Sequence, residues 1–377
     1  MRVVFDARHL QTVSRTRGIG RYSRNLLAAF ARRAPDDIGW TLLTLRNFAP
    51  ADPSPLPPHR TRSTYRLRRP ELTMLAVDPL LLPFELAGQG DLYHSVQLGL
   101  PAVTRARTVL TIHDLAPLRW PSHYLRLPYS RVGHALQYGL AKRADAIIAV
   151  SESTKADVVA RLGIPHERVR VIPEAVDLGF HPPSYEVGVS VARERFGVPG
   201  RYVLYVGQFD PRKNMDGLFA AFARAAERDR DLRLVIVGTL GKLAVLMRDA
   251  LARSRVDPAR VVVAGGVDDP TLAALYAGAE CLLHAAWLEG FGLTALESLA
   301  AGTPVVGYRA GAVAEVVGDA GLLVDEQEPD ALGEALVALL GDDALRSRLR
   351  AVAKPRAARF SWDRAADDTL AVYRTLS

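Results

Sequence analysis

The stretch LEGFGLTALESLAAGTPVV, residues 288–306, decides how the fold and the site are interpreted. We expect a short helix over residues 293–301, because Gly302 and Pro304 stop it. The apolar residues that begin at Pro304 predict a buried strand. Backbone N–H groups at the start of the helix would point at an anion, and the glycines of the Gly-Phe-Gly turn would let a ligand approach them closely.

Two glutamates flank this helix start. Glu289 lies in the loop before the Gly-Phe-Gly turn, and Glu297 lies within the first turns of the helix. A carboxylate accepts hydrogen bonds from hydroxyl groups, whereas a helix N-terminus favours a phosphate. The spacing therefore suits a ligand that carries a phosphate between two hydroxyl-bearing groups.

Short apolar strands alternate with amphipathic helical stretches along the rest of the chain. In the first half we expect strands at 2–7, 107–114 and 145–151 and helices at 18–33 and 153–163. The second half repeats this pattern, and the prolines within residues 180–188 mark the expected linker. Such alternation predicts an α/β protein with two doubly wound, Rossmann-like parallel sheets, and a ligand at the carboxyl ends of the strands.

The composition excludes several classes of protein. With 377 residues, of which 49% are apolar, the chain is expected to hold two domains. Its single cysteine, Cys281, rules out an internal disulfide framework, and no CxxC or HxxxH pair indicates zinc. The apolar run from Leu72 is interrupted by Asp78, two prolines and Glu85, so it does not predict a membrane span. Asp6 comes too early for the apolar core of a signal peptide, and we expect a cytoplasmic protein.

The net charge of +7 is unevenly distributed. Residues 1–180 carry 25 Lys and Arg against 15 Asp and Glu, a balance of +10, whereas the remainder carries 23 against 26, a balance of −3. Five arginines lie between Arg60 and Arg69. No nucleic-acid-binding motif accompanies them, so no nucleic acid partner is expected. Two interpretations stay open: peripheral contact with an anionic membrane on its inner face, and a solvated arginine-rich loop.

A second stretch that could bind a phosphate is VLYVGQFDPRKN, residues 203–214. A strand is expected to end at Gly207, and Arg212 and Lys213 follow it just before a helix. Two cations beside the carboxyl end of a strand can clamp a diphosphate. The alternative is an ordinary surface pair of cations.

Two further features fall in the first half. His113 and Asp114 end a strand, where a histidine can hydrogen-bond a sugar or move a proton; alternatively, the pair only caps the strand. Gly18 and Gly20 lie at the entrance to the first long helix, in a loop that admits a phosphate or an acceptor, or that is only a flexible turn. Ser23 takes the third glycine place of a G-x-G-x-x-G pattern, which argues against a nicotinamide enzyme.

Taken together, these features resemble the retaining glycosyltransferases of family 4, which have the GT-B fold. The resemblance rests on the family's E-x7-E motif, Glu289 to Glu297, and on the supporting stretches VGQFDPRKN, TIHD, VSESTKADVV, VIPEAVDLGFHP, AGAVAEVVGDAGLLVD and FSWDRAADDTLAVY. It covers almost the whole chain. The opening FDAR with GIGRY is similar to mannosyltransferase-type members that build bacterial polysaccharides.

The resemblance implies two Rossmann-like domains facing a central cleft: an acceptor-side domain over residues 1–185, a donor-binding domain over 186–359, and a C-terminal helix, 360–377, that crosses back. It implies retaining transfer of a hexose from a nucleoside-diphosphate sugar to a hydroxyl of a glycan, a lipid-linked acceptor or a small molecule, with no metal or other cofactor. GDP-mannose is the first donor expected, with UDP-glucose-type and deoxysugar nucleotides as runners-up. Two different functions also stay open: a nucleotide-sugar-binding protein without turnover, and a phosphorylase or epimerase on the same fold.

The resemblance also implies roles for individual residues. Glu289 would contact hydroxyls of the transferred sugar, Lys213 would neutralise the leaving diphosphate, and His113 would support the sugar ring. Glu297 would hold the ribose hydroxyls. The other donor-side residues would surround the diphosphate, sugar and base: Gly207, Arg212, Gly265, Gly266, Val267, Gly290, Phe291, Gly292 and Leu293. Gly18, Gly20 and Asp114 would lie on the acceptor side.

The chain departs from the family pattern at two places. Many members have arginine where Gln208 stands, and whether Arg212 replaces it is left open. The usual Pro-Asn-Gly-Val-Asp at the domain junction is here Pro-Glu-Ala-Val-Asp, residues 173–177, which leaves the contacts of this loop open.

Overall fold

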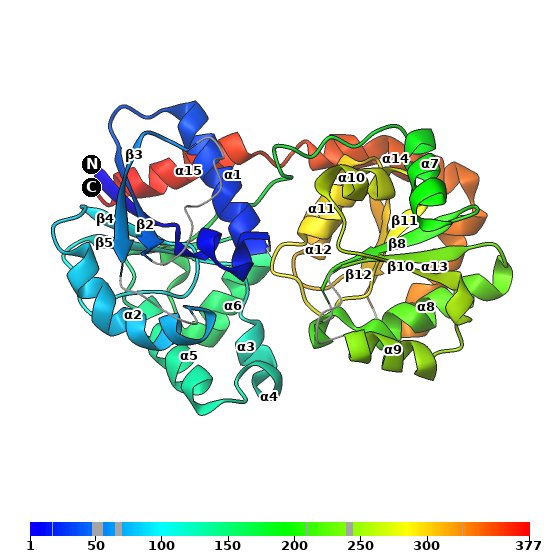
Figure 1. Cartoon of the computed structure of the whole chain (residues 1–377), viewed down its shortest axis with the longest axis horizontal. Coiled ribbons are helices and arrows are strands. Elements are labelled where there is room, and N and C mark those ends of the chain that lie inside the picture. The colour runs from blue at the N-terminus through cyan, green and yellow to red at the C-terminus, as the bar shows by residue number, and fades with distance from the viewer. Residues whose placement is uncertain (17, 47–55, 65–69, 209, 239–243, 326) are drawn as a thin grey trace. The chain divides into compact units, whose positions relative to one another are not determined.

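The computed structural model describes residues 1–377 except 17, 47–55, 65–69, 209, 239–243 and 326 (Figure 1). The chain forms two compact units: a first unit, Met1–Asp177 with Ser361–Ser377, and a second unit, Leu178–Phe360. The division falls before the sequence-based boundary at residue 185. The reason is that the intervening segment packs on the second unit, where the rings of Phe180 and Tyr276 lie edge to face with centroids 5.9 Å apart.

The first unit is built on a seven-stranded parallel sheet in the order β3-β2-β1-β4-β5-β6-β7. Its strands are β1 (Arg2–Asp6), β2 (Gly39–Leu45), β3 (His59–Thr64), β4 (Leu92–Ser95), β5 (Arg107–Ile112), β6 (Ala146–Ala149) and β7 (Val169–Val171). The central strands are buried along almost their whole length, as expected for a parallel sheet covered by helices on both faces.

The helices of the first unit are α1 (Gly18–Arg33), α2 (Pro70–Leu86), α3 (Ala116–Arg119), α4 (Pro121–Tyr124), α5 (Pro128–Ala141), α6 (Glu152–Leu162) and α15 (Trp362–Thr375), with short 3-10 turns at Arg8–Gln11 (η1), Val13–Thr16 (η2) and His166–Arg168 (η3). α6 begins where the Ser151 Oγ accepts the N–H of Thr154 at 3.0 Å, and it ends at Gly163 in the left-handed conformation. α15 packs on α1, and the Trp362 indole N–H donates to the carbonyl of Val176 at 2.9 Å. The last helix therefore belongs to the first unit although it follows the second in sequence.

The second unit is built on a six-stranded parallel sheet in the order β10-β9-β8-β11-β12-β13. Its strands are β8 (Tyr202–Val206), β9 (Arg233–Val237), β10 (Val261–Gly265), β11 (Cys281–His284), β12 (Val305–Tyr308) and β13 (Gly321–Val324). Its helices are α7 (Tyr185–Phe196), α8 (Met215–Arg228), α9 (Ala244–Arg253), α10 (Asp269–Ala277), α11 (Leu293–Ala300), α12 (Val313–Val317), α13 (Pro329–Gly341) and α14 (Asp343–Ala357), with 3-10 turns at Pro211–Lys213 (η4) and Pro258–Arg260 (η6). α11 and β12 confirm the helix and the strand predicted from residues 288–306.

Both units show the same winding. In each sheet the first strand lies in the middle, the next two follow on one side, and the later strands follow on the other. This is the doubly wound, Rossmann-like order, and it confirms the predicted fold class. In the second unit the winding reverses between β8 and β11, so the carboxyl ends of these two strands are where the fold places a ligand.

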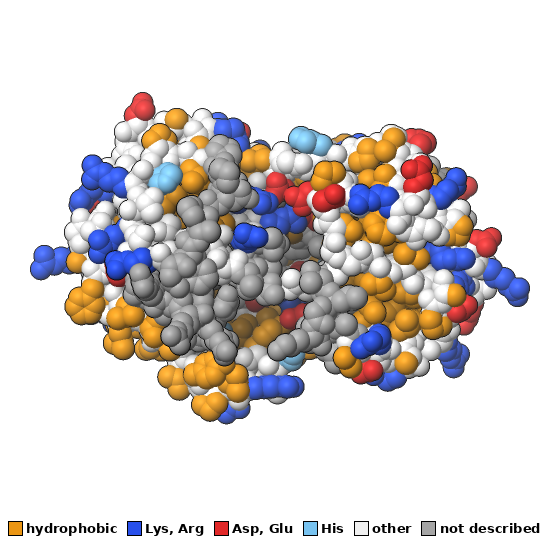
Figure 2. Space-filling model, viewed as in Figure 1, with side chains coloured by type: hydrophobic (Ala, Val, Ile, Leu, Met, Phe, Trp, Pro, Cys, Tyr) orange, Lys and Arg blue, Asp and Glu red, His pale blue; other side chains and the backbone are white. Residues whose placement is uncertain are grey.

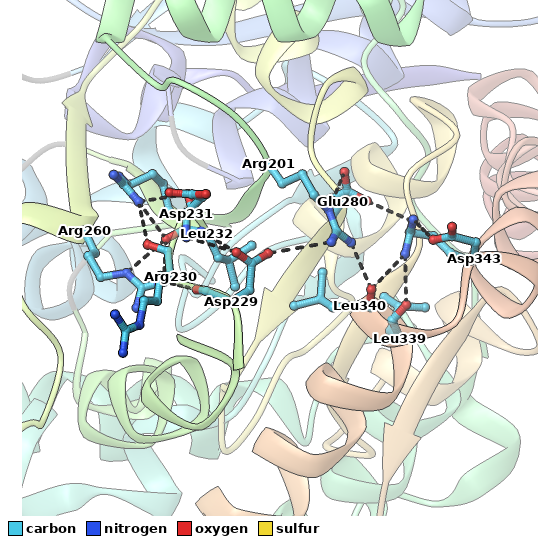
Figure 3. A network of polar contacts seen from close by, with 12 residues as sticks. Arg201, Asp229, Arg230, Asp231, Leu232, Arg260, Glu280, Leu339, Leu340 and Asp343 are labelled. Carbon is cyan, nitrogen blue, oxygen red and sulfur yellow. Dashed lines mark hydrogen bonds and ion pairs between the residues drawn. The ribbon is translucent and has the colours of Figure 1, made fainter. Parts of the chain in front are cut away.

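The opposite, amino-terminal edge of the second sheet is held by a polar network (Figure 3). Arg201, just before β8, contacts Glu280, just before β11, at 3.4 Å, and Arg346 of α14 contacts the same carboxylate at 2.9 Å. Before β10, Arg260 donates to the carbonyls of Leu232 and neighbouring residues. Glu280 is 3% exposed, so Arg201 and Arg346 compensate a buried charge. The network stabilises the edge of the sheet that lies away from the expected ligand.

Among the residues that the structure describes, no helix is both long enough and apolar enough to cross a membrane.

Candidate functional site

The second unit brings Lys213, His284 and Glu289 together at the reversal point between β8 and β11. Lys213 ends the short turn η4, which follows β8. His284 is the last residue of β11, and Glu289 lies in the loop between β11 and α11. These three side chains therefore come from the two strand ends where a doubly wound sheet binds its ligand.

Glu289 is the centre of this cluster. Its Oε1 accepts from the Lys213 ammonium and lies 3.2 Å from the His284 Nε2. Glu289 is only 7% exposed, and burial by itself would raise the pKa of its carboxyl group. The charge of Lys213, the hydrogen bond from His284 and the charge of Arg212 outweigh that effect and hold the pKa of Glu289 well below its usual range. Glu289 is therefore a carboxylate, not an acid, at neutral pH.

Backbone contacts fix the loop that carries Glu289. The Glu289 carbonyl accepts the N–H of Ala312 at 3.0 Å, and a Cβ on Gly311 would lie 2.3 Å from that same oxygen. The backbone N–H of Trp287 donates to the carbonyl of Arg212 at 2.7 Å, which ties the loop to η4. Only glycine at 311 allows this approach, so the position of Glu289 depends on the loop after β12 as well as on its own.

α11 begins at Gly292, whose φ of +99° favours glycine. No side chain caps this helix start, so the first N–H groups, from Leu293 onward, stay available to a ligand in the described structure. Gly290 and Phe291 complete the turn that precedes it, and Phe291 is buried against Phe360. The backbone N–H groups that were expected to bind an anion therefore lie at a helix start that closely follows Glu289 in the chain.

Glu297 lies inside α11 and is 1% exposed. One of its carboxylate oxygens, Oε2, accepts from the Tyr276 hydroxyl at 2.8 Å. Tyr276 belongs to α10, so this bond joins the two helices that flank β11. Glu297 is thus more deeply buried than Glu289, and Tyr276 fixes its orientation.

The other expected donor-side residues lie at the same edge of the second sheet. Gly207 directly follows β8, and its N–H donates to the carbonyl of Val237 at the end of β9. Gly265 ends β10 with φ of +71°, and Gly266 and Val267 lead from it toward α10. These backbone groups therefore line the carboxyl ends of the strands on the β8 side of the reversal point.

Arg212 contacts Asp210. Its Nε lies 3.7 Å from the Asp210 carboxylate, which also accepts the backbone N–H of Arg212 at 3.0 Å. Asp210 therefore orients Arg212, whose charge also helps to lower the pKa of Glu289.

In the first unit, His113 is held by two acceptors. Its Nε2 lies 3.2 Å from the carbonyl oxygen of Val96, which can only accept, so Nε2 carries a proton. Its Nδ1 lies 2.9 Å from the Glu174 carboxyl group. Glu174 is 3% exposed, and no partner of its other oxygen, Oε2, lies among the described residues. The ring of Tyr22 packs edge to face on His113 at 4.8 Å.

The remaining acceptor-side residues have structural contacts. The Asp114 Oδ1 accepts the N–H of Ala116 at 2.9 Å, where α3 begins. The helix expected over residues 18–33 is confirmed as α1, and Gly18 and Gly20 lie in its first turn rather than in a loop before it, so the loop interpretation was wrong. A Cβ on Gly20 would lie 2.3 Å from the Ser14 carbonyl, and this close packing of η2 on α1 explains why glycine stands there.

Sequence reasoning missed His284 and Glu174 as site residues. A polar residue that ends the buried strand ECLLH, a few residues before Glu289, was the available signal for His284. Glu174 was visible only as a departure from the junction pattern, since its partner His113 is 61 residues away in sequence.

In the described part of the chain, no group of three or more His, Cys, Asp or Glu side chains is placed to hold a metal ion. The single cysteine, Cys281, is buried in β11, and burial raises the pKa of its thiol.

Comparisons with known proteins agree with this arrangement. Residues 16–180 match the family described as Glycosyltransferase Family 4, and residues 191–356 match the family described as Glycosyl transferases group 1. The D-inositol 3-phosphate glycosyltransferase of Xylanimonas cellulosilytica is 34% identical over 299 residues, 76% of this chain and 69% of that protein. The O-antigen chain mannosyltransferase B of Escherichia coli is 28% identical over 289 residues, 76% and 74% of the two chains. The crystal structure of Anabaena HepE in complex with UDP and glucose matches with a TM-score of 0.76 and 17% identity over 100% of both chains.

Two doubly wound parallel sheets, together with these matches, define a glycosyltransferase with the GT-B fold. Within that class, the chain belongs to glycosyltransferase family 4.

Proposed function

We propose that this glycosyltransferase moves a hexose from a nucleoside-diphosphate sugar to an acceptor hydroxyl, with retention of the anomeric configuration. The observation that carries the proposal is the cluster of Lys213, His284 and Glu289 beside the open start of α11. It offers a cation and backbone N–H groups for a diphosphate, and a carboxylate for sugar hydroxyls, within one unit. These are the groups that transfer from a nucleotide sugar requires.

Lys213 and the N-terminus of α11 supply positive charge at one place. As the bond between the sugar and the diphosphate breaks, negative charge develops on the leaving phosphate, and fixed donors stabilise it. Because these donors can meet that charge, the proposed reaction needs no metal ion or other cofactor. The leaving phosphate oxygen would help to take the proton of the acceptor, on the same face of the sugar.

Glu289 acts in this proposal as an acceptor of hydrogen bonds. Its low pKa makes it unsuited to donate a proton to a leaving group. It would orient hydroxyls of the transferred sugar, while His284 holds the carboxylate in place. Glu297, fixed by Tyr276, would bind the ribose hydroxyls of the nucleotide.

For the donor we propose GDP-mannose first. The support is the similarity to the mannosyltransferase of E. coli and the likeness of FDAR and GIGRY to mannosyltransferase-type members. UDP-hexoses are the second choice, since Anabaena HepE was solved with UDP and glucose. For the acceptor, the inositol phosphate named for the X. cellulosilytica relative supports a hydroxyl of a polar small molecule beside the glycan and lipid-linked classes.

A thermal-shift series with GDP, UDP, ADP and dTDP identifies the base. A nucleotide at 100 times its dissociation constant stabilises the native state by about 2.7 kcal/mol, which gives a clear shift. The matched variants are Lys213→Met and, as control, Lys354→Met on the exposed side of α14. Only Lys213→Met is expected to lose most of the nucleotide-induced shift.

Transfer is tested next with the sugar nucleotide of that base, and proton NMR of the product reports the anomeric configuration. An inverted centre would contradict the retaining assignment. Nucleotide binding without transfer or hydrolysis for any acceptor would contradict the proposed activity and favour a binding protein.

A further inference from the structure

The first unit exposes an unusual number of large apolar side chains on two neighbouring helices. On α2, Leu80 is 68% and Phe84 is 77% exposed, and on α5, Val132 is 65% exposed. We call this surface the α2–α5 face; its members are Leu80, Leu81, Phe84, Val103, Leu127, Tyr129, Val132 and Leu136. Figure 2 shows hydrophobic side chains gathered where Figure 1 places α2 and α5. Scattered apolar residues are normal on a protein surface, but a contiguous set indicates an interaction site.

Contacts in the structure make these side chains one surface. α2 packs on α5, and a Cβ on Gly133 of α5 would lie 3.1 Å from the Leu75 Cβ of α2. The backbone N–H of Ala102 donates to the carbonyl of Pro79 at 2.9 Å, which places Val103 beside the exposed turn of α2. The helices thus lie side by side, with the loop at Val103 continuing the surface.

Helical spacing separates this face from the core. On α5, Tyr129, Val132 and Leu136 are exposed, whereas Gly133 and Gln137 are buried. On α2, Leu80 and Phe84 are one turn apart on the exposed side, and Asp78, Leu82 and Leu86 are buried. The exposed apolar stripes are therefore additional to the side chains that stabilise the fold.

The charges around the face are almost all positive. Between Asp114 and Asp145 the sequence has no acidic residue, but it has five cations: Arg119, Arg126, Arg131, Lys142 and Arg143. Arg119 pairs with Asp157 of α6 at 2.9 Å, so the positive charge of the rim comes from the other four. Arg126 and Arg131 donate to backbone carbonyls rather than to carboxylates. Arg105, beside Val103, is also exposed.

The acidic residues of α2 whose side chains the structure describes do not change this balance. Asp78 is fully buried, where Arg8 contacts it at 2.8 Å. Glu85 faces Arg62 of β3 at 3.1 Å. The exposed rim therefore keeps its positive charge.

We propose that the α2–α5 face docks this protein on a bilayer that contains anionic phospholipid. Apolar side chains inserted between headgroups, together with surrounding cations, bind such a bilayer without a membrane span. A second copy of the chain is a poorer occupant, because two such faces would bring like charges together. Of the five arginines first considered for a membrane contact, only Arg60 and Arg62 are described, both on β3; Arg66, Arg68 and Arg69 lie outside the described residues.

Vesicle co-sedimentation of the full chain tests the proposal. The wild-type protein is expected to sediment with vesicles of equal parts phosphatidylcholine and phosphatidylglycerol, to stay in solution with phosphatidylcholine alone, and to dissociate as salt is raised. Leu80→Ser with Phe84→Ser is expected to lower the partition coefficient at least about tenfold. Arg105→Gln with Arg131→Gln is expected to weaken binding at low salt. The matched control is Val187→Ser with Val352→Ser, two exposed valines of the second unit, which is expected to bind like wild type.

Three results would overturn the proposal: no sedimentation with anionic vesicles at low salt, equal loss in the control variant, or undiminished binding of the Leu80 and Phe84 variant. Sedimentation velocity without lipid adds a fourth. A wild-type dimer that becomes a monomer in the Leu80 and Phe84 variant would assign the face to a second copy instead. Transfer to a soluble acceptor is measured on the same samples, and it is expected to be unchanged, so failure here is separable from failure of the proposed activity.

Discussion

Replacing Lys213 by methionine tests how much the ammonium group stabilises the ionised carboxylate of Glu289. The substitution keeps most of the length and apolar surface of the side chain but removes its ammonium group. The Glu289 side chain is 9% and the Lys213 side chain 14% exposed, so the pair is close to fully buried. Removing one partner of a buried pair leaves an uncompensated charge, which typically costs about 3–5 kcal/mol. Because His284 and Arg212 still act on Glu289, we expect about 2–3 kcal/mol at neutral pH.

The dependence on pH distinguishes this cause from a packing defect. In the wild type the folded-state pKa of Glu289 lies below the unfolded value of 4.5, so its stabilising contribution is present above pH 4.5 and is lost as the pH falls through the folded pKa. Burial is the largest influence on the pKa of Glu289, and it raises that pKa. In Lys213→Met the charge of the lysine no longer offsets it. If the folded pKa then exceeds 4.5, the sign reverses and stability falls as the pH rises. The difference between the two proteins is therefore expected to grow from about pH 4 to about pH 7.

The difference in unfolding free energy between wild type and Lys213→Met is measured by urea unfolding, followed by fluorine NMR of protein labelled with 5-fluorotryptophan. This probe reports the second unit, which holds Lys213. Trp287 is the single tryptophan of the second unit, so its resonance reports that unit separately from the other three. Lys354→Met serves as the matched control. The reasoning would be refuted by a difference that stays constant over this pH range. It would also be refuted by a double-mutant cycle with Glu289→Gln whose coupling energy lies within about 0.5 kcal/mol of zero.

Three further predictions address the roles of single residues. Glu289→Gln keeps the size but removes the charge, so turnover is expected to fall by orders of magnitude while nucleotide affinity, from titration calorimetry, changes only a few-fold; the reverse pattern would contradict the assigned role. Glu174→Gln keeps a hydrogen-bond partner for His113 but removes the carboxyl group, so kcat is expected to change more than the melting temperature; an unchanged kcat with a lowered melting temperature would contradict this. Arg8→Met removes the cation of a fully buried cluster with two carboxylates and is expected to cost about 3–5 kcal/mol in urea unfolding, less at low pH, where the carboxylates are neutralised; a loss below about 1 kcal/mol would contradict it.

The sequence predicted the elements whose signals are local. α11 and β12 were expected from Gly302, Pro304 and the apolar run between helix and strand, and both are present. The alternation of strands and helices likewise predicted two doubly wound sheets, because a parallel sheet requires a crossover helix between strands. The family resemblance implied that Lys213 and Glu289 act on one nucleotide sugar, and the structure brings them together because both follow strands whose carboxyl ends meet at one edge of the sheet.

What the sequence did not predict depends on partners that are distant along the chain. The His113–Glu174 contact needs β5, β6 and β7 to lie side by side, and that order is a property of the whole sheet. The exposure of α2 is another case. An apolar run is expected to be buried, but here the buried side of the helix is the one that carries Asp78, because Arg8 holds that carboxylate inside the unit. Leu80 and Phe84, on the other side of the helix, are therefore left in solvent.

Both units place a histidine at or just after a strand end and set a glutamate against it, but the charge is fixed differently in the two pairs. Glu289 has Lys213 as a neighbour, which holds its pKa low, so the carboxylate stays ionised when hydroxyl groups approach. Glu174 faces His113 across 2.9 Å, and the carbonyl of Val96 already takes the other ring proton. A proton must therefore lie between Glu174 and His113, either on the ring or on the carboxyl group, for this hydrogen bond to exist. The first pair therefore lies beside a cation, whereas the second pair is joined by one hydrogen bond whose histidine also faces a carbonyl. In the second unit the fixed charge serves to hold sugar hydroxyls in the proposed reaction, and the contribution of the pair in the first unit is what Glu174→Gln measures.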